Sequence, residues 1–222
     1  MTVFYAYIHN INDDNTTRVL MVFANRETAD EWWRAILTIP NVASAYQRIS
    51  PQFYVHDTRC NVLEFFTNDR FRPISEAFRG RLFLTLLHDR GGREFPIIPP
   101  LSITDHVSGN WFFIRSVSKP SLYWHYASGG IVASDTKRTQ FQIKGRTLQD
   151  GTIMIKDDLI TLTVAERRNV DVNRSGNLVV PGVAREFRFG DFARGAFAVD
   201  AGDDAIAYDP VSLRNMRWEL VD

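Results

Sequence analysis

Apolar and polar residues alternate along the second half of the chain in a pattern that recurs three times. The three units open on residues 110–115, 151–156 and 195–200, roughly forty residues apart. They close on residues 140–143, 186–189 and 217–220, where two apolar residues flank a polar one. This period of two is typical of a strand with one buried face. The pattern predicts three lobes, residues 110–150, 151–194 and 195–222, arranged around one core.

The first half of the chain has a different rhythm, in which strand patterns alternate with helical ones. Residues 4–8 and 18–23 are apolar strand candidates joined by a polar turn at residues 12–15. Residues 26–37 then carry Ala29, Trp32, Trp33 and Ile36 at helical spacing, and Asn25 stands at the N-cap position. We therefore expect two strands followed by an amphipathic helix.

Further strands and helices are expected before residue 100. They are a strand at 52–56, a helix capped by Asp57 that runs through Leu63 and Phe66, a short helix with Pro73 in its first turn, a strand at 81–87, and a turn at 89–92 that leads into a strand at 94–98. This order predicts an α+β domain, with helices on one face of a mixed sheet. The prolines at 96, 99 and 100 place a boundary between residues 1–105 and an all-β domain at 106–222.

Charge and composition narrow the classes of function. Lysine plus arginine equals aspartate plus glutamate at 26 each, so the chain lacks the positive charge typical of a nucleic-acid-binding protein. No apolar run approaches the roughly 18 residues that a membrane-spanning helix needs. Cys60 is the single cysteine, which excludes an intramolecular disulfide and favours a reducing compartment. We expect a cytoplasmic protein without a membrane span.

The first lobe resembles a repeat of the ricin-B-like β-trefoil lectins. The resemblance rests on residues 113–117, 122–124, 129–132 and 140–143, and extends over residues 110–222. Members of that superfamily close each lobe on Gln-x-Trp or a relative of it, and the corresponding pairs here are Gln140-Phe141, Glu186-Phe187 and Arg217-Trp218. The full motif is kept in no lobe. The resemblance implies a β-trefoil fold and sugar binding of the kind seen in cytosolic fungal lectins.

Aromatic residues gather in the first lobe at positions 123–126. If they form a strand, Trp124 and Tyr126 lie on one face and Tyr123 and His125 on the other. A sheet needs only one apolar face, so one pair is free to stack on the C–H face of a sugar. We predict that Trp124 and Tyr126 bind the ligand, with Asp135, Lys137 and Asn173 as polar neighbours. The alternative is that these rings fill the core or a domain interface.

Catalytic and metal chemistry have less support in the sequence. Histidine stands beside an acid at 56–57, 88–89 and 105–106, but adjacent strand residues point apart. Cys60 lies one helical turn from His56, yet a lone cysteine is usually a small hydrophobic residue. Scattered histidines and acids predict no metal site and no cofactor.

The leading hypothesis is therefore a non-catalytic carbohydrate-binding protein. A protein-binding or protease-inhibitor trefoil is one alternative, for which exposed apolar residues in loops such as 165–176 would be the sign. An enzyme with a small-molecule cleft between the two domains is another, because domain junctions often hold pockets. Trp32 and Trp33 project about 100° apart on a helix, so a possible homodimer is a further expectation.

Overall fold

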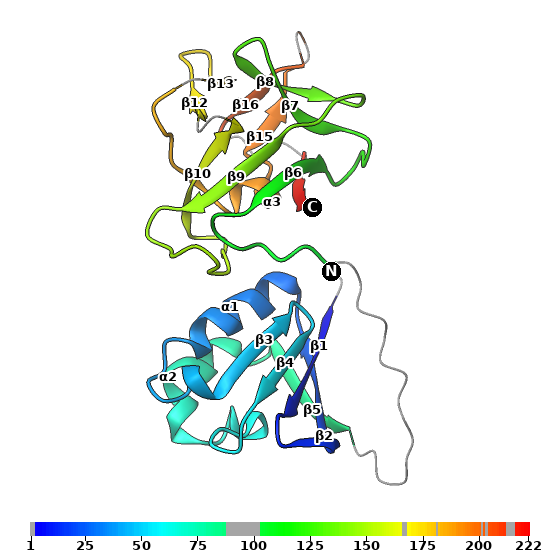
Figure 1. Cartoon of the computed structure of the whole chain (residues 1–222), viewed down its shortest axis with the longest axis vertical. Coiled ribbons are helices and arrows are strands. Elements are labelled where there is room, and N and C mark those ends of the chain that lie inside the picture. Colours follow the sequence, from blue (N-terminus) through cyan, green and yellow to red (C-terminus); the bar gives the residue numbers. More distant parts are fainter. Residues whose placement is uncertain are drawn as a thin grey trace. The chain divides into compact units, whose positions relative to one another are not determined.

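The chain folds into two compact units, Met1–Asp105 and His106–Asp222 (Figure 1). The structure is a computed structural model that describes residues 3–87, 103–165, 168–180, 182–200, 202, 204–211 and 216–222, apart from the side chains of residues 13–17. The predicted turn at 89–92 and strand at 94–98 lie outside the described residues. Within the described part, no helix is long and apolar enough to cross a membrane.

The first unit is built on a five-stranded sheet with the order β3-β4-β1-β2-β5. Its strands are β1 (Phe4–Asn10), β2 (Asp13–Phe23), β3 (Tyr46–Ser50), β4 (Phe53–His56) and β5 (Leu82–Leu87). β1 pairs with β4 in parallel, and the other pairs are antiparallel, so the sheet is mixed as predicted. The predicted strands at 4–8, 18–23, 52–56 and 81–87 are confirmed. β3 was not predicted, and β2 begins within the expected turn.

Helix α1 (Arg26–Ile36) contributes the centre of the first unit's core. Asn25 is its N-cap as predicted, because its side chain accepts a hydrogen bond from the backbone N–H of Thr28 at 2.8 Å. Trp32 is fully buried, with its ring centroid 5.5 Å from that of Tyr54 and 5.8 Å from that of Phe23. The helix thus covers the face of the sheet that carries Ala6, Ile8 and Met21.

Short helices complete this side of the sheet. They are η1 (Ala43–Ala45), η2 (Val62–Glu64), η3 (Asp69–Phe71), α2 (Arg72–Ser75) and η4 (Glu76–Phe78). Pro73 lies in the first turn of α2, as predicted. The helix expected to begin at Asp57 is wrong: Asn61 caps the single 3₁₀ turn η2 instead. The carboxylate of Asp57 accepts hydrogen bonds from the backbone and side chain of Arg59, so it closes a turn.

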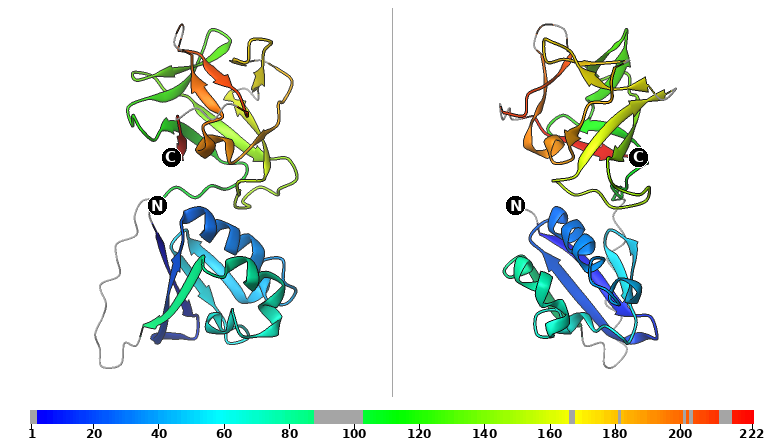
Figure 2. Two further views of the ribbon diagram at one scale, coloured as in Figure 1. Left: turned by 180° about the vertical axis from the view of Figure 1, so that it is seen from behind. Right: turned by 90° about the vertical axis from the view of Figure 1, so that its left-hand side faces the viewer.

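The second unit contains a ten-stranded antiparallel sheet. Its strands are β6 (Trp111–Ser116), β7 (Tyr123–Ala127), β8 (Gly130–Ser134), β9 (Gln140–Gly145), β10 (Leu159–Val164), β11 (Arg168–Asn169), β12 (Asp171–Val172), β13 (Leu178–Val179), β14 (Phe187–Arg188) and β17 (Trp218–Val221). A separate hairpin joins β15 (Phe197–Val199) to β16 (Ile206–Tyr208), and a short helix α3 (Asp191–Arg194) precedes it (Figure 2).

Two of the three predicted lobe openings are strands, namely β6 and β15, and all three closings are strands, namely β9, β14 and β17. The predicted opening at 151–156 is wrong. Residue Ile153 forms only an isolated bridge with Val107, and the second lobe's long strand, β10, begins at Leu159. Ile153 and Met154 are nevertheless buried. Their apolar character reflects burial in an irregular segment, which the period-two pattern does not distinguish from burial in a strand.

Strand alternation places the core of the second unit. Every second residue of the long strands points inward and is fully buried, including Phe112, Ile114, Phe141, Ile143, Ile160 and Leu162. Trp124 lies among the rings of this core. Its ring centroid is 5.1 Å from that of Phe197, 5.6 Å from that of Trp218 and 5.8 Å from that of Phe141. One continuous hydrophobic cluster therefore receives side chains from all three lobes.

Candidate functional site

Strand β7 carries aromatic residues on both of its faces, as the sequence predicts, but the predicted binding face is wrong. Trp124 is fully buried and its indole stacks on no surface that a ligand could reach. Tyr126 also packs against the core, and its hydroxyl accepts a hydrogen bond from Arg168 at 3.0 Å. The Arg168 guanidinium lies 4.8 Å from the centre of the Tyr126 ring. Trp124 therefore fills the core, which was the alternative interpretation, and the partly buried Tyr126 packs against that core.

The polar residues predicted to accompany Trp124 have local contacts of their own. Asp135 is exposed and lies 3.9 Å from the ammonium of Lys119. The exposed Lys137 donates its backbone N–H to the hydroxyl of Ser134. Asn173 accepts hydrogen bonds from the backbone N–H groups of Ser175 and Asn177, and so shapes a tight turn. The ring of Trp124 packs instead against Phe141, Phe192, Phe197 and Trp218.

The opposite face of β7 presents its rings outward. Tyr123 and His125 are partly exposed, and on the neighbouring strand β6 Phe113 is partly exposed while Trp111 is 40% exposed. The Phe113 and Tyr123 rings meet edge to face, with centroids 6.4 Å apart. We call the set of Trp111, Phe113, Tyr123, His125 and Arg138 the lobe-one outer face. It is an aromatic surface on a regular sheet, whose strands hold the rings in fixed positions.

Arg138 crosses this surface from the loop between β8 and β9. Its guanidinium carbon lies 4.2 Å from the centre of the Phe113 ring and 5.6 Å from that of Tyr123. The residue is exposed, and within the described part of the chain it has no carboxylate partner. Stacking on the rings therefore fixes the position of a cation whose N–H groups remain available to a ligand.

Two other cations near this face, Arg115 and Lys119, have acidic partners. Arg115 pairs with Glu219 on the adjacent strand β17 at 2.7 Å, and the hydrogen bond with Glu219 raises the pKa of Arg115 above its usual value. Lys119 has Asp135 as its neighbour. His125 is held by Thr139, whose hydroxyl lies 3.0 Å from the ring Nδ1. The lobe-one outer face thus combines aromatic surface, one imidazole and one guanidinium without a counter-charge.

The residues considered for catalysis do not form a catalytic arrangement. His56 is buried, and its Nδ1 lies 3.0 Å from the backbone carbonyl of Asp57 rather than its carboxylate. Cys60 is buried too, with Arg70 Nη1 at 2.9 Å from its sulfur. His106 packs against the Phe189 ring at 5.5 Å, and the pair at 88–89 lies outside the described residues. Among the described residues no cluster of His, Cys, Asp and Glu could hold a metal ion.

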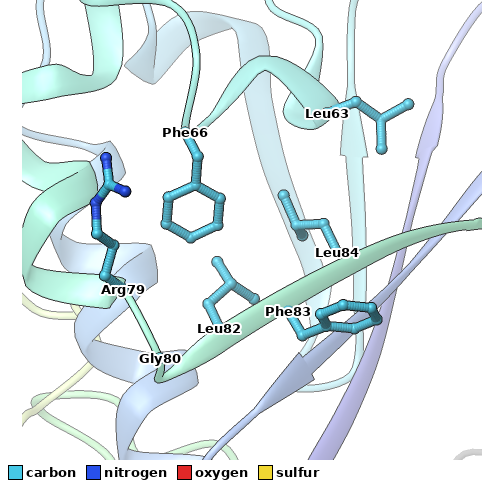
Figure 3. A pocket seen from close by; sticks show the side chains of 7 residues that line it. All are labelled: Leu63, Phe66, Arg79, Gly80, Leu82, Phe83 and Leu84. Carbon is cyan, nitrogen blue, oxygen red and sulfur yellow. The ribbon is translucent and has the colours of Figure 1, made fainter.

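An open apolar pocket lies in the first unit along strand β5 (Figure 3). Its volume is about 380 Å³, and its lining consists of Leu63, Phe66, Arg79, Gly80, Leu82, Phe83 and Leu84. Phe83 is 64% exposed, whereas Leu82 belongs to the core. The one charged residue, Arg79, pairs with Glu76 at 2.8 Å. This pocket offers hydrophobic surface to a ligand. Its one charged side chain, Arg79, is already paired with Glu76 and so is not free to orient a small molecule.

The sequence predicted a site on Trp124 and Tyr126 of β7, whereas the structure buries Trp124 and leaves the rings on the opposite face of this strand partly exposed. A further indication was present in the sequence: Trp111 and Phe113 share a face of β6, and so do Tyr123 and His125 of β7. Arg138 carries no such signal, because its place on the rings depends on the path of a loop. Comparison with protein-family models, with curated proteins and with solved structures finds no match for this chain. The lobe-one outer face is therefore the part of the molecule from which a function can be inferred.

Proposed function

We propose that this protein binds carbohydrate without catalysis, and that its binding site is the lobe-one outer face. The observation that carries the proposal is the position of Arg138 on the rings of Phe113 and Tyr123. Sugar sites in proteins combine an aromatic ring, which packs on the C–H face of the sugar, with a few fixed polar groups. Both are present on this face, and both lie on or against regular strands.

The rings have different roles in this proposal. Phe113 holds the guanidinium of Arg138 over its face, so its own surface is occupied. Trp111 keeps 40% of its surface exposed and Tyr123 is partly exposed, so these two rings offer the surface for stacking. His125 and Arg138 then supply hydrogen bonds to hydroxyl groups beside the rings. Trp124 supports the site from beneath as a core residue.

The strand pairing supports a trefoil-like architecture for the second unit, as part of the same proposal. The ladder β17-β6-β9-β10-β14 joins opening and closing strands of successive lobes. The first and second lobes each add one hairpin, β7–β8 and β12–β13, whereas in the third lobe the opening strand β15 itself pairs with β16. A trefoil of the ricin-B-like kind would have this threefold plan. The departures are the short strands of the second and third lobes and the missing strand at 151–156.

A glycan array followed by titration calorimetry tests the proposed function. The wild-type protein should bind a defined oligosaccharide, and Trp111→Ala and Tyr123→Ala should each weaken binding by about tenfold, because each removes one stacking ring. Tyr5→Ala is a matched control, since Tyr5 is 43% exposed on the first unit and belongs to no proposed site. Absence of glycan binding by the wild-type protein would reject the proposal. So would a result in which Trp111→Ala and Tyr123→Ala bind the glycan as tightly as the wild type does.

A further inference from the structure

The charge distribution around Arg138 points to a particular class of sugar, and we infer that the lobe-one outer face recognises an anionic saccharide, one that carries a carboxylate or a sulfate group. The inference rests on the proposed function, since it specifies the ligand of the same site. It arises from the contrast between Arg138, which lies over two rings, and two neighbouring cations, Arg115 and Lys119, which have acidic partners. The relevant residues all come from strands β6 and β7 and the loops that follow β6 and β8.

Arg138 differs from two neighbouring cations in having no acidic partner among the described residues. Arg115 is neutralised by Glu219 at 2.7 Å, and Lys119 faces Asp135 at 3.9 Å. Arg138 contacts two rings and, among the described residues, neither an acid nor a backbone carbonyl. An exposed arginine usually remains hydrated, but this one lies within an aromatic surface that a sugar ring would cover. Covering a cation without giving it a partner is unfavourable, so the ligand that suits the site brings the anion.

The shape of the Arg138 guanidinium suits an anionic group with two oxygens. A guanidinium is planar, and its N–H donors match the spacing of carboxylate and sulfate oxygens. The guanidinium carbon of Arg138 lies 4.2 Å from the centre of the Phe113 ring, and because the residue is exposed a ligand can reach its N–H donors. A neutral hydroxyl would use only part of this donor set. An anionic substituent on a sugar stacked against Tyr123 or Trp111 would use a larger part of it.

The side chain of Arg138 is held in place before any ligand binds. A long arginine side chain normally loses rotamer freedom when it binds a ligand. In this protein the contacts with Phe113 and Tyr123 already restrict it before any ligand arrives. The rings therefore have two functions, because they position the cation and also provide apolar surface. Such an arrangement favours a ligand that has a C–H face and a negative charge a few ångströms apart, as acidic sugars have.

Titration with three related probes tests the inference: lactose, sialyllactose, which carries a carboxylate, and sulfated lactose. The wild-type protein should bind at least one acidic probe about tenfold more tightly than lactose, since charge-assisted hydrogen bonds are stronger than neutral ones. Raising the salt concentration should reduce this preference, because the anion is recognised at the surface. Arg138→Gln should weaken binding of the acidic probes more than binding of lactose, because it removes the charge as well as a hydrogen-bond donor, and so should bring the three affinities together.

Arg146→Gln is the matched control, because it removes the same charge from another loop of the second unit, where Arg146 pairs with Glu186. It should keep the preference for the acidic probe. Equal affinities for all three probes in the wild-type protein would overturn the inference and leave carbohydrate binding intact. Retention of the acidic preference in Arg138→Gln would overturn it in the same way. Failure of the wild-type protein to bind any of the probes or any array glycan would instead reject the proposed function itself.

Discussion

The guanidinium of Arg48 on strand β3 lies 2.7 Å from the carboxylate of Asp105, which ends the first unit. The same nitrogen lies 2.9 Å from Asp30 of helix α1. Arg26 adds a hydrogen bond to the backbone carbonyl of Thr104. The side chains of Arg48 and Asp30 are only 5% and 7% exposed. These contacts tie residues 104 and 105 to the helix and to the edge of the sheet, so the end of the unit is held by buried charges.

Replacement of Arg48 by methionine should strongly destabilise the first unit. The change leaves Asp30 buried without its nearest cation, and loss of one partner of a buried ion pair typically costs about 3–5 kcal/mol. The double variant Arg48→Met/Asp30→Asn should be less destabilised than the sum of the two single changes, because it removes both charges of the buried pair together. Urea unfolding followed by tryptophan fluorescence measures the three free energies of unfolding.

Arg79→Met is the control for that series. Arg79 and Glu76 form an ion pair in which both side chains are 63% exposed, and such surface pairs contribute about 0–1 kcal/mol. A loss of similar size in Arg48→Met and Arg79→Met would contradict the role assigned to the buried cluster. Additive effects in the Arg48 and Asp30 double variant would contradict it as well.

Truncation of two neighbouring residues of strand β7 should affect different properties, stability for Trp124 and glycan binding for Tyr123. Trp124→Ala removes a fully buried indole from the core and should lower the free energy of unfolding by about 3–5 kcal/mol. Tyr123→Ala removes a partly exposed ring and should cost about 1 kcal/mol or less, while it weakens glycan binding. Thermal unfolding and titration of the same two variants measure both quantities. A Trp124→Ala protein of wild-type stability would show that its ring is not part of the core.

The stability of the second unit should fall as the pH rises from about 10 to about 12, and Tyr208 should contribute to this. Its hydroxyl donates to the carboxylate of Asp191 at 2.9 Å. Burial, together with this hydrogen bond, raises the pKa of Tyr208 to about 12 from its usual value of 10. Between these pH values the unfolded chain releases the proton and the folded one keeps it, so unfolding becomes more favourable as the pH rises.

The variant Tyr208→Phe isolates this contribution from those of the other tyrosines. It should be less stable than the wild type near neutral pH, because it leaves the buried Asp191 with one hydrogen bond fewer. Its stability should then decline less steeply above pH 10. Chemical unfolding at a series of pH values gives the free energy of unfolding of the wild type and of Tyr208→Phe as a function of pH. If the two curves decline equally steeply above pH 10, the pKa of Tyr208 is not raised.

The cap of helix α1 should make a smaller but measurable contribution to stability. Asn25 accepts hydrogen bonds from the backbone N–H of Thr28 at 2.8 Å and from its hydroxyl at 3.0 Å. Asn25→Ala should therefore lower the free energy of unfolding by about 0.5–2 kcal/mol. Asn25→Asp keeps an acceptor and should stay close to the wild type. Equal losses in the two variants, measured by thermal unfolding, would mean that the cap is not the cause.

Local signals account for the elements that were predicted correctly. Asn25 before an amphipathic run identified α1, and the apolar strands around Ile8, Met21 and Leu84 were visible from composition and period. The failures have a physical cause as well. Asp57 and Asn61 are both competent caps, and the sequence does not indicate which one a helix will use. Ile153 and Met154 are buried in an irregular segment, and their apolar side chains resemble those of a strand in the sequence.

The candidate site depended on information that is not local. Alternation divided Tyr123 and His125 from Trp124 and Tyr126, and that division is correct. Which pair faces inward depends on the volume left by Phe141, Phe197 and Trp218, which come from distant parts of the chain. The position of Arg138 depends on the β8–β9 loop in the same way. No periodicity within a single segment contains either fact.

Strand β7 carries rings on both of its faces. Its hydrophobic pattern alone therefore does not fix its register, because pairing shifted by one residue along the neighbouring strand would also bury aromatic side chains. In most half-buried strands such a slip would expose the apolar face to water, which opposes it. Here the slipped strand would still bury two rings. The correct alignment depends instead on polar contacts, above all on the Thr139 hydroxyl, which meets both His125 and the backbone N–H of Tyr126 at 3.0 Å. One side-chain hydroxyl thus helps to decide which aromatic pair the protein presents to its surroundings.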